Sequence, residues 1–112
     1  MEMNEVLLTY NEYITRLPKG CTIISNYLRE DDIHKSMLGI QEFSEGVMWL
    51  IKANEILKEA GIHEQLNIKK IQQYLVEIND GLQRQDFVLV GDLFEYEIVP
   101  FFEEISESYT ND

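Results

Sequence analysis

The chain has one cysteine and no long apolar run, and these two absences exclude several classes of protein. With Cys21 alone among 112 residues, it can form neither an internal disulfide nor a cysteine-based metal site. No stretch approaches the roughly 18 apolar residues of a membrane-spanning helix. The N-terminal Met-Glu-Met-Asn-Glu lacks the basic and apolar regions of a secretory signal peptide. We therefore expect a cytoplasmic protein that does not enter a membrane.

Basic residues are scarce, and none follows Arg84. Nine Lys and Arg stand against 21 Asp and Glu, for a net charge of −12. Residues 85–112 hold eight acids and no base, so this last quarter alone contributes −8. Binding to nucleic acid or to an anionic membrane surface needs clusters of Lys and Arg. Since only Lys69 and Lys70 are adjacent, the composition argues against both partners.

The sequence does have helical periodicity, with 45% hydrophobic residues, enough for one folded domain. In four segments the apolar residues fall on one helical face, and no strand or hairpin pattern is present. Short connections favour antiparallel neighbours, so we expect an all-α, up-down four-helix bundle forming a single domain over residues 1–112. The expected helices span residues 3–29, 32–60, 68–83 and 86–106.

Capping residues support these boundaries. Asp32, Asn67 and Asp86 precede the second, third and fourth segments, where a side-chain oxygen can accept a hydrogen bond from a free backbone N–H. Gly61 follows the second segment, where glycine readily takes the left-handed conformation that ends a helix.

Both prolines fall inside the expected helices, and two glycines fall inside the second one. The apolar stripe of the first segment keeps its phase through Pro18, which favours one long helix kinked there over two helices broken at residues 18–20. Pro100 should bend the fourth helix in the same way. Gly39 and Gly46 lie within the second helix, at a local cost of about 1 kcal/mol each, and would let a neighbouring helix approach closely.

No pattern in the sequence identifies an enzyme. Asp92, Glu95 and Glu97 spread around the helix axis instead of converging on one metal, and no Glu-x-x-His motif is present. His34 and His63 have no partner at metal-ligand spacing. A Ser-His-Asp order and a phosphate-binding glycine loop are absent. We therefore predict no catalytic residue, no metal and no cofactor, and the three acids are either structural or part of a binding face.

Two of the expected helices carry a second apolar face besides the one that should enter the core. The core face of the fourth helix is expected to consist of Phe87, Val90, Phe94, Ile98, Phe101 and Ile105. The second faces of the second and fourth helices are formed by Leu38, Trp49, Ile56, Leu89, Leu93, Tyr96 and Pro100. Such faces can pack against a second neighbour inside the bundle, or they can bind a partner through aromatic anchors rimmed by charge. The residues that we predict to contact a partner are Trp49, Ile56, Leu89, Leu93, Tyr96 and Glu97.

Two segments carry a family resemblance. They are the run from Asp86 to Pro100, Asp-Phe-Val-Leu-Val-Gly-Asp-Leu-Phe-Glu-Tyr-Glu-Ile-Val-Pro, and the run Glu45-Gly-Val-Met-Trp-Leu-Ile. Together they resemble a group of uncharacterised small helical-bundle proteins of Bacillus- and Clostridium-type bacteria, which share a D-[FY]-V-L-x-[AG]-D-x-[LF]-E-Y-E-x-x-P segment. The resemblance implies a helical bundle of bacterial origin and implies no activity.

From the residues we predict a non-enzymatic, acidic helical module that binds another protein or a second copy of itself. Its carboxylates would select a basic or amphipathic partner. Two alternatives remain open at this point. The chain could be an acidic decoy that inhibits a nucleic-acid-binding protein, or a chaperone-like binder of a secreted or flagellar protein.

Overall fold

The computed structural model describes residues 2–62 and 66–110, with side chains described as far as Glu107. The first three helices are α1 (Met3–Arg29), α2 (Ile33–Glu59) and α3 (Ile68–Gln83). A last helix follows in three parts, α4 (Phe87–Leu93), the π-helical turn η1 (Phe94–Ile98) and α5 (Val99–Thr110). No strand occurs within the described ranges. The expected all-α fold with two long leading helices is confirmed.

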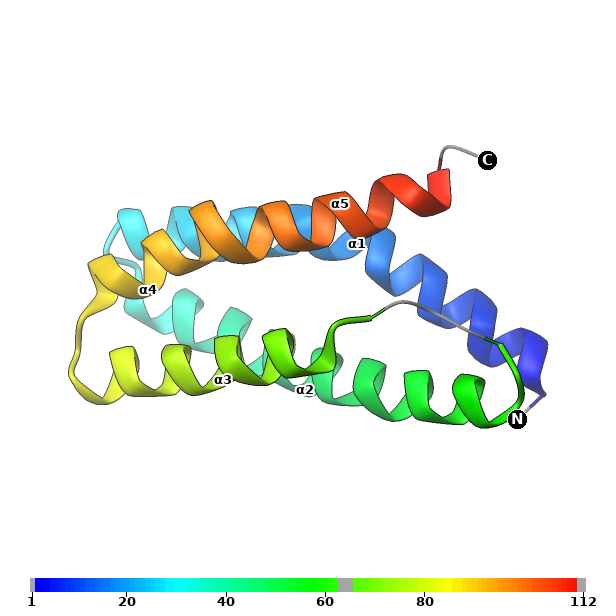
Figure 1. The fold of residues 1–112 in the computed structure, drawn as a ribbon. Coiled ribbons are helices and arrows are strands. Elements are labelled where there is room, and N and C mark those ends of the chain that lie inside the picture. The colour runs from blue at the N-terminus through cyan, green and yellow to red at the C-terminus, as the bar shows by residue number, and fades with distance from the viewer. Residues whose placement is uncertain (1, 63–65, 111–112) are drawn as a thin grey trace.

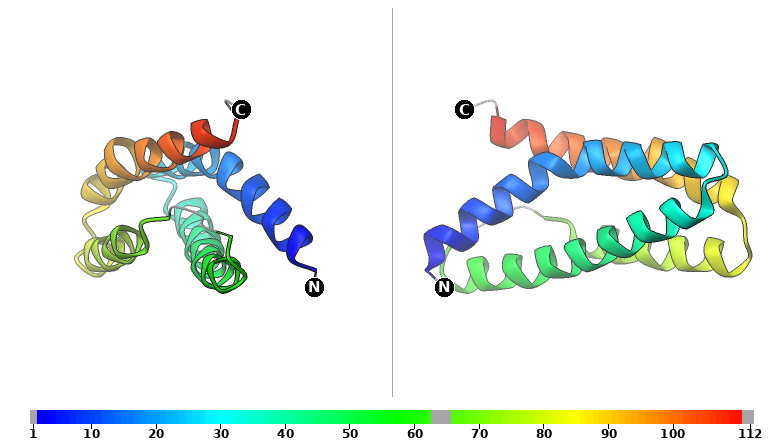
Figure 2. Two further views of the ribbon diagram at one scale, coloured as in Figure 1. Left: turned by 45° about the vertical axis from the view of Figure 1, so that its right-hand side comes forward. Right: turned by 180° about the vertical axis from the view of Figure 1, so that it is seen from behind.

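The four helices alternate in direction along the bundle (Figure 1). α1 lies between α2 and the last helix and packs against both, while α3 packs chiefly against α4. The left-hand view in Figure 2 shows α3 on the far side of the bundle from the N-terminal half of α1. α1 is therefore the central wall of the fold, and α3 is held mainly through its hairpin with α4.

Pro18 lies inside α1 without breaking it, so the favoured expectation of one long helix is confirmed. α1 changes direction part-way along its length, which is visible from behind in Figure 2. Proline removes one backbone hydrogen bond and crowds the carbonyl four residues earlier, and both effects bend a helix.

Directly before Pro100, where the sequence predicted a bend, the last helix contains the π turn η1. The Val99 N–H donates to the carbonyl of Phe94, five residues earlier. A wider turn directly before Pro100 accommodates a residue that has no N–H and that crowds the preceding turn. The extra residue also shifts the phase of the core face, so Phe102 is fully buried where the sequence predicted Phe101, which is only half-buried.

The core is apolar with one internal polar contact. Phe43 of α2 packs edge-on against Phe94 and Phe102, with ring centroids 5.2 and 6.3 Å apart, and so joins α2 to the last helix. The Tyr10 hydroxyl donates to the Asn54 side-chain carbonyl at 3.3 Å, a buried hydrogen bond between α1 and α2. A buried polar pair of this kind favours one register of the two helices, because any slip leaves both groups without their partner.

The expected capping residues all act as caps. The side chains of Asp32, Asn67 and Asp86 accept hydrogen bonds from backbone N–H groups three residues later, at 3.1–3.2 Å. Gly61 follows α2 with a φ of 83°, as expected. Gln85, in the corresponding place after α3, has a φ of 56° although it is not glycine. A left-handed conformation strains a residue that has a Cβ.

Replacing Gln85 by glycine should therefore stabilise the fold. We predict that Gln85→Gly raises the free energy of unfolding by about 1 kcal/mol, because glycine takes the left-handed conformation without steric cost. Urea denaturation followed by circular dichroism measures the change. The control is Gln72→Gly at an exposed position inside α3, which should lower the free energy of unfolding by about 1 kcal/mol. A loss of stability in both variants would contradict the strain assigned to Gln85.

Candidate functional site

Four of the six residues predicted to contact a partner lie together in a groove between α3 and the last helix. The groove has a volume of about 400 Å³. We call it the acidic groove, and it is lined by Glu77, Asp80, Arg84, Leu89, Asp92, Leu93, Tyr96 and Glu97. The packing of the α3–α4 hairpin thus brings the second face of the last helix opposite three charged residues of α3.

Carboxylates dominate the acidic groove. Four of its lining residues are acids and one is basic, which gives a net charge of −3. The base, Arg84, is already paired with Asp80 of the same helix, at 2.9 Å. Glu77 and Glu97 come from opposite walls and both lie near Tyr74. Burial first, and then these two carboxylates, raise the pKa of the Tyr74 hydroxyl.

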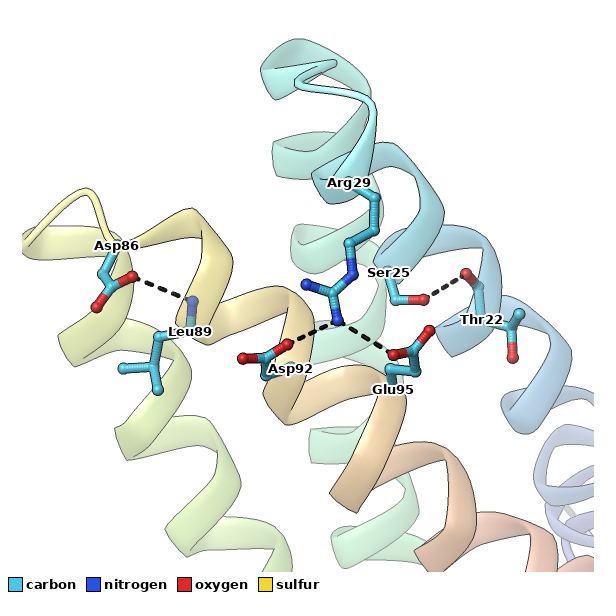
Figure 3. A network of polar contacts seen from close by, with 7 residues as sticks. All are labelled: Thr22, Ser25, Arg29, Asp86, Leu89, Asp92 and Glu95. Atoms are coloured by element: carbon cyan, nitrogen blue, oxygen red, sulfur yellow. Dashed lines mark hydrogen bonds and ion pairs between the residues drawn. The ribbon is translucent and has the colours of Figure 1, made fainter.

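Asp92 is held in place from outside the groove. The Arg29 guanidinium, in the last turn of α1, donates through one nitrogen to Asp92 at 2.7 Å and to Glu95 at 3.1 Å (Figure 3). Hydrogen bonding to Asp92 is the largest effect that raises the pKa of Arg29. The guanidinium lies across Gly91, where an added Cβ would stand 3.4 Å from one of its nitrogens.

The bridge from Arg29 gives a partner within the chain to two of the three acids whose role the sequence left open. Asp92 and Glu95 connect α1 to the last helix, and Asp92 also lines the acidic groove. An exposed ion pair of this kind contributes little stability by itself, but one cation shared by two carboxylates fixes their orientation. Glu97 takes no part in this bridge and faces the acidic groove.

The predicted partner residues differ in how much surface they offer. Tyr96, in the π turn, is 68% exposed, and hydrogen bonding to Glu95 raises the pKa of its hydroxyl. Leu89 and Glu97 are also exposed. Leu93 is only 5% exposed and belongs to the core, so it forms the floor of the acidic groove and offers little surface of its own. Pro100 is exposed on the next turn but does not line the groove.

A second, larger groove of about 920 Å³ lies between α1 and α2. We call it the neutral groove, because its four charged residues, Arg16, Lys35, Glu42 and Glu45, balance one another. Its apolar lining includes the buried side chains Leu17, Cys21, Ile24 and Phe43 and the exposed side chains Ile23 and Leu38. Leu38 is one of the residues that the sequence placed on the second face of α2.

The other two residues of that face continue the line of the neutral groove along α2. Leu38, Trp49 and Ile56 are separated by 11 and 7 residues, which returns a helix to nearly the same angle. Trp49 is half-buried and packs edge-on against Tyr13 of α1, with ring centroids 6.4 Å apart. Ile56 is exposed. Trp49 thus already has a neighbour within the chain, whereas Ile56 and Leu38 remain accessible.

Two glycines bring α1 and α2 close together along the neutral groove. A Cβ added at Gly39 would lie 2.9 Å from Ile24, and one added at Gly46 would overlap the Tyr13 hydroxyl. Both glycines therefore allow the close approach of a neighbouring helix that the sequence predicted. At Gly20 no atom lies within 4 Å of an added Cβ.

We find no arrangement of chemical groups in the described part of the chain that suggests catalysis. Within it, no group of three or more His, Cys, Asp or Glu residues could hold a metal ion. His34 is exposed near the start of α2, and His63 lies outside the described residues. Cys21 is buried, and that burial raises the pKa of its thiol to about 12. No described helix is long and apolar enough to cross a membrane.

Together, the fold and its two grooves define a small, acidic, all-α bundle. The chain belongs to the family described as Domain of unknown function (DUF8042), whose pattern it matches over residues 5–108. A search of curated proteins gives no match. A search of solved structures gives none either.

The contact between Tyr13 and Gly46 predicts opposite effects for two glycine substitutions. Gly46→Ala should displace Tyr13 from Trp49 and lower the free energy of unfolding by about 1 kcal/mol or more, since the steric conflict outweighs the helix propensity of alanine. Gly20→Ala, where space is open, should raise it by roughly 0.5–1 kcal/mol. Urea denaturation measures both, and the fluorescence of Trp49 should shift only in Gly46→Ala. Stabilisation by both substitutions would contradict the close approach.

The buried thiol of Cys21 should be nearly inert. Only the thiolate reacts with iodoacetamide, and a pKa of about 12 leaves about one thiol in ten thousand ionised at pH 8. We predict alkylation at least about 100-fold slower in the folded protein than in urea. In the folded protein the rate should keep rising above pH 10, whereas in urea it should level off above about pH 9. Equal rates in the two states would show that Cys21 is accessible.

Proposed function

We propose that this chain is a non-enzymatic, cytoplasmic interaction module that binds a basic, amphipathic segment of another protein in the acidic groove. The observation that supports the proposal most directly is the composition of that groove. Exposed Leu89 and Tyr96 stand beside a floor formed by Leu93, and carboxylates from two helices surround them. Aromatic and aliphatic anchors within a charged rim are typical of protein interfaces.

Two carboxylates give the groove its selectivity in this proposal. Within the described residues, neither Glu77 nor Glu97 forms an ion pair with a base of the chain. They come from opposite walls, so Lys or Arg side chains of a bound segment could pair with both at once. Desolvating an uncompensated carboxylate is unfavourable, and an acidic or purely apolar segment would therefore be rejected.

The π turn explains how the anchor is presented. Tyr96 lies in the middle of η1, where the wider turn rotates side chains away from the positions that a regular α-helix would give them. The Arg29 bridge to Asp92 and Glu95 holds the flanking residues of the same helix. Tyr96 would thus meet a partner from a fixed backbone, which reduces the entropy lost on binding.

A synthetic peptide tests this proposal. The probe is a fluorescein-labelled amphipathic peptide of Lys and Leu, four helical turns long, and its binding is followed by fluorescence anisotropy. We predict saturable binding that weakens as salt rises, and no binding of the matched peptide with Glu in place of Lys. Glu77→Gln combined with Glu97→Gln should weaken binding about tenfold, and so should Tyr96→Ala.

The matched control removes the same charge elsewhere on the chain. Glu103→Gln combined with Glu104→Gln also takes away two exposed carboxylates, but outside the acidic groove. This control should change the affinity less than about twofold. Equal weakening by both pairs would mean that the peptide responds only to net charge, and the acidic groove would not be its site.

A further inference from the structure

We propose that the neutral groove is a self-association surface, in which a second copy of the chain binds the first in an antiparallel, two-fold symmetric pair. This inference concerns the α1–α2 side of the bundle and does not depend on the acidic groove. It rests on the shape of the neutral groove, on its accessible apolar side chains and on how charge is arranged along it.

The neutral groove offers apolar surface that the chain itself leaves uncovered. Leu38 is 49% exposed and Ile23 41% exposed, one on each helix that borders the groove. Gly20 contributes no side chain to this surface, and the space where its Cβ would stand is open. A second pair of helices could therefore approach closely and bury Leu38 and Ile23 of both copies, which is the driving force expected for a dimer.

Charge decides in favour of a second copy as the occupant. The whole chain carries a net charge of −12, so two copies repel each other over most of their surfaces. The neutral groove is different, because its two basic and two acidic residues cancel. A partner selected by opposite charge would gain little there, whereas two copies of this chain can meet at this surface without a charge penalty.

The charges are also separated along the groove. α1 and α2 run antiparallel, with Tyr13 against Gly46 near one end and Lys35 over the Tyr27 ring, 5.6 Å from its centroid, near the other. Fourteen residues of helix separate Tyr13 from Tyr27, which is about 21 Å.

Among the residues that line the groove, the first end holds Arg16, Glu42 and Glu45, with a net charge of −1. At the other end the charged lining residue is Lys35, beside which Asp32 lies outside the lining. A two-fold axis across the middle places the Lys35 end of each copy on the Glu42–Glu45 end of the other. The groove is thus complementary to itself in one orientation only. Lys35 also lies 3.8 Å from Asp32, but an exposed pair at that distance contributes little and leaves the lysine free to turn to a partner.

Sedimentation velocity over a range of micromolar concentrations tests the inference on the full chain. We expect the unmodified protein to sediment as a dimer that dissociates on dilution. Leu38→Asp should weaken association at least about a hundredfold, because the new carboxylate would be buried without a partner. Val76→Asp, at an exposed valine of α3 outside the neutral groove, should leave the dimer intact.

A charge exchange tests the orientation of the two copies and does not depend on any core residue. Lys35→Glu should weaken association about tenfold, and adding Glu45→Lys should restore it, because the double variant inverts both ends at an unchanged net charge. Lys69→Glu, which changes the net charge as Lys35→Glu does but lies outside the groove, should have little effect. A monomer at every concentration, or a dimer that Leu38→Asp leaves intact, would overturn the proposal. Failure of the double variant to restore association would overturn the antiparallel arrangement.

Discussion

The burial of α1 between α2 and the last helix is the interaction on which the rest of the structure depends. One side of α1 packs with Phe43 and its neighbours on α2, and the other packs along the full length of the last helix. Its buried hydrogen bond from Tyr10 to Asn54 and its terminal bridge from Arg29 to Asp92 fix the position of both neighbours. Because α1 packs against both of these neighbours, no further helix covers the neutral groove between α1 and α2 or the acidic groove between α3 and the last helix.

One of these two surfaces is acidic and the other is neutral, and this difference has a simple origin in the sequence. The last quarter of the chain contains acids and no bases, so any groove it borders is acidic. Arg16 and Lys35 lie on the first two helices and balance Glu42 and Glu45 in the other groove. One chain can thus present a surface that favours a basic segment and another that tolerates a second copy.

The sequence predicted features that depend on residues within one helical turn, such as the helix caps. It did not predict features that depend on contacts between helices distant in the chain. Asp32, Asn67 and Asp86 were recognisable as caps, since a cap acts within one turn of its own helix. The burial of Phe102 in place of Phe101 was not predictable from periodicity, which assumes a constant number of residues per turn and so misses a π turn.

The bridge from Arg29 and the contribution of α3 to the acidic groove arise from tertiary packing. The sequence of neither helix alone indicates them. Leu93 shows the same limit, because periodicity placed it on the second apolar face of the last helix, whereas in the fold it is only 5% exposed and forms the floor of the acidic groove.

The most direct measurement of the central claim, that the two grooves are separate surfaces with separate occupants, is chemical-shift mapping on the isotope-labelled protein. The amides of Gly20, Gly39 and Gly46 report on the neutral groove, and those of Leu89, Tyr96 and Glu97 report on the acidic groove. We predict that a peptide of Lys and Leu shifts only the second set, and that dilution of the protein alone shifts only the first. Movement of the glycine amides on addition of peptide at constant protein concentration would contradict the separation of the two surfaces.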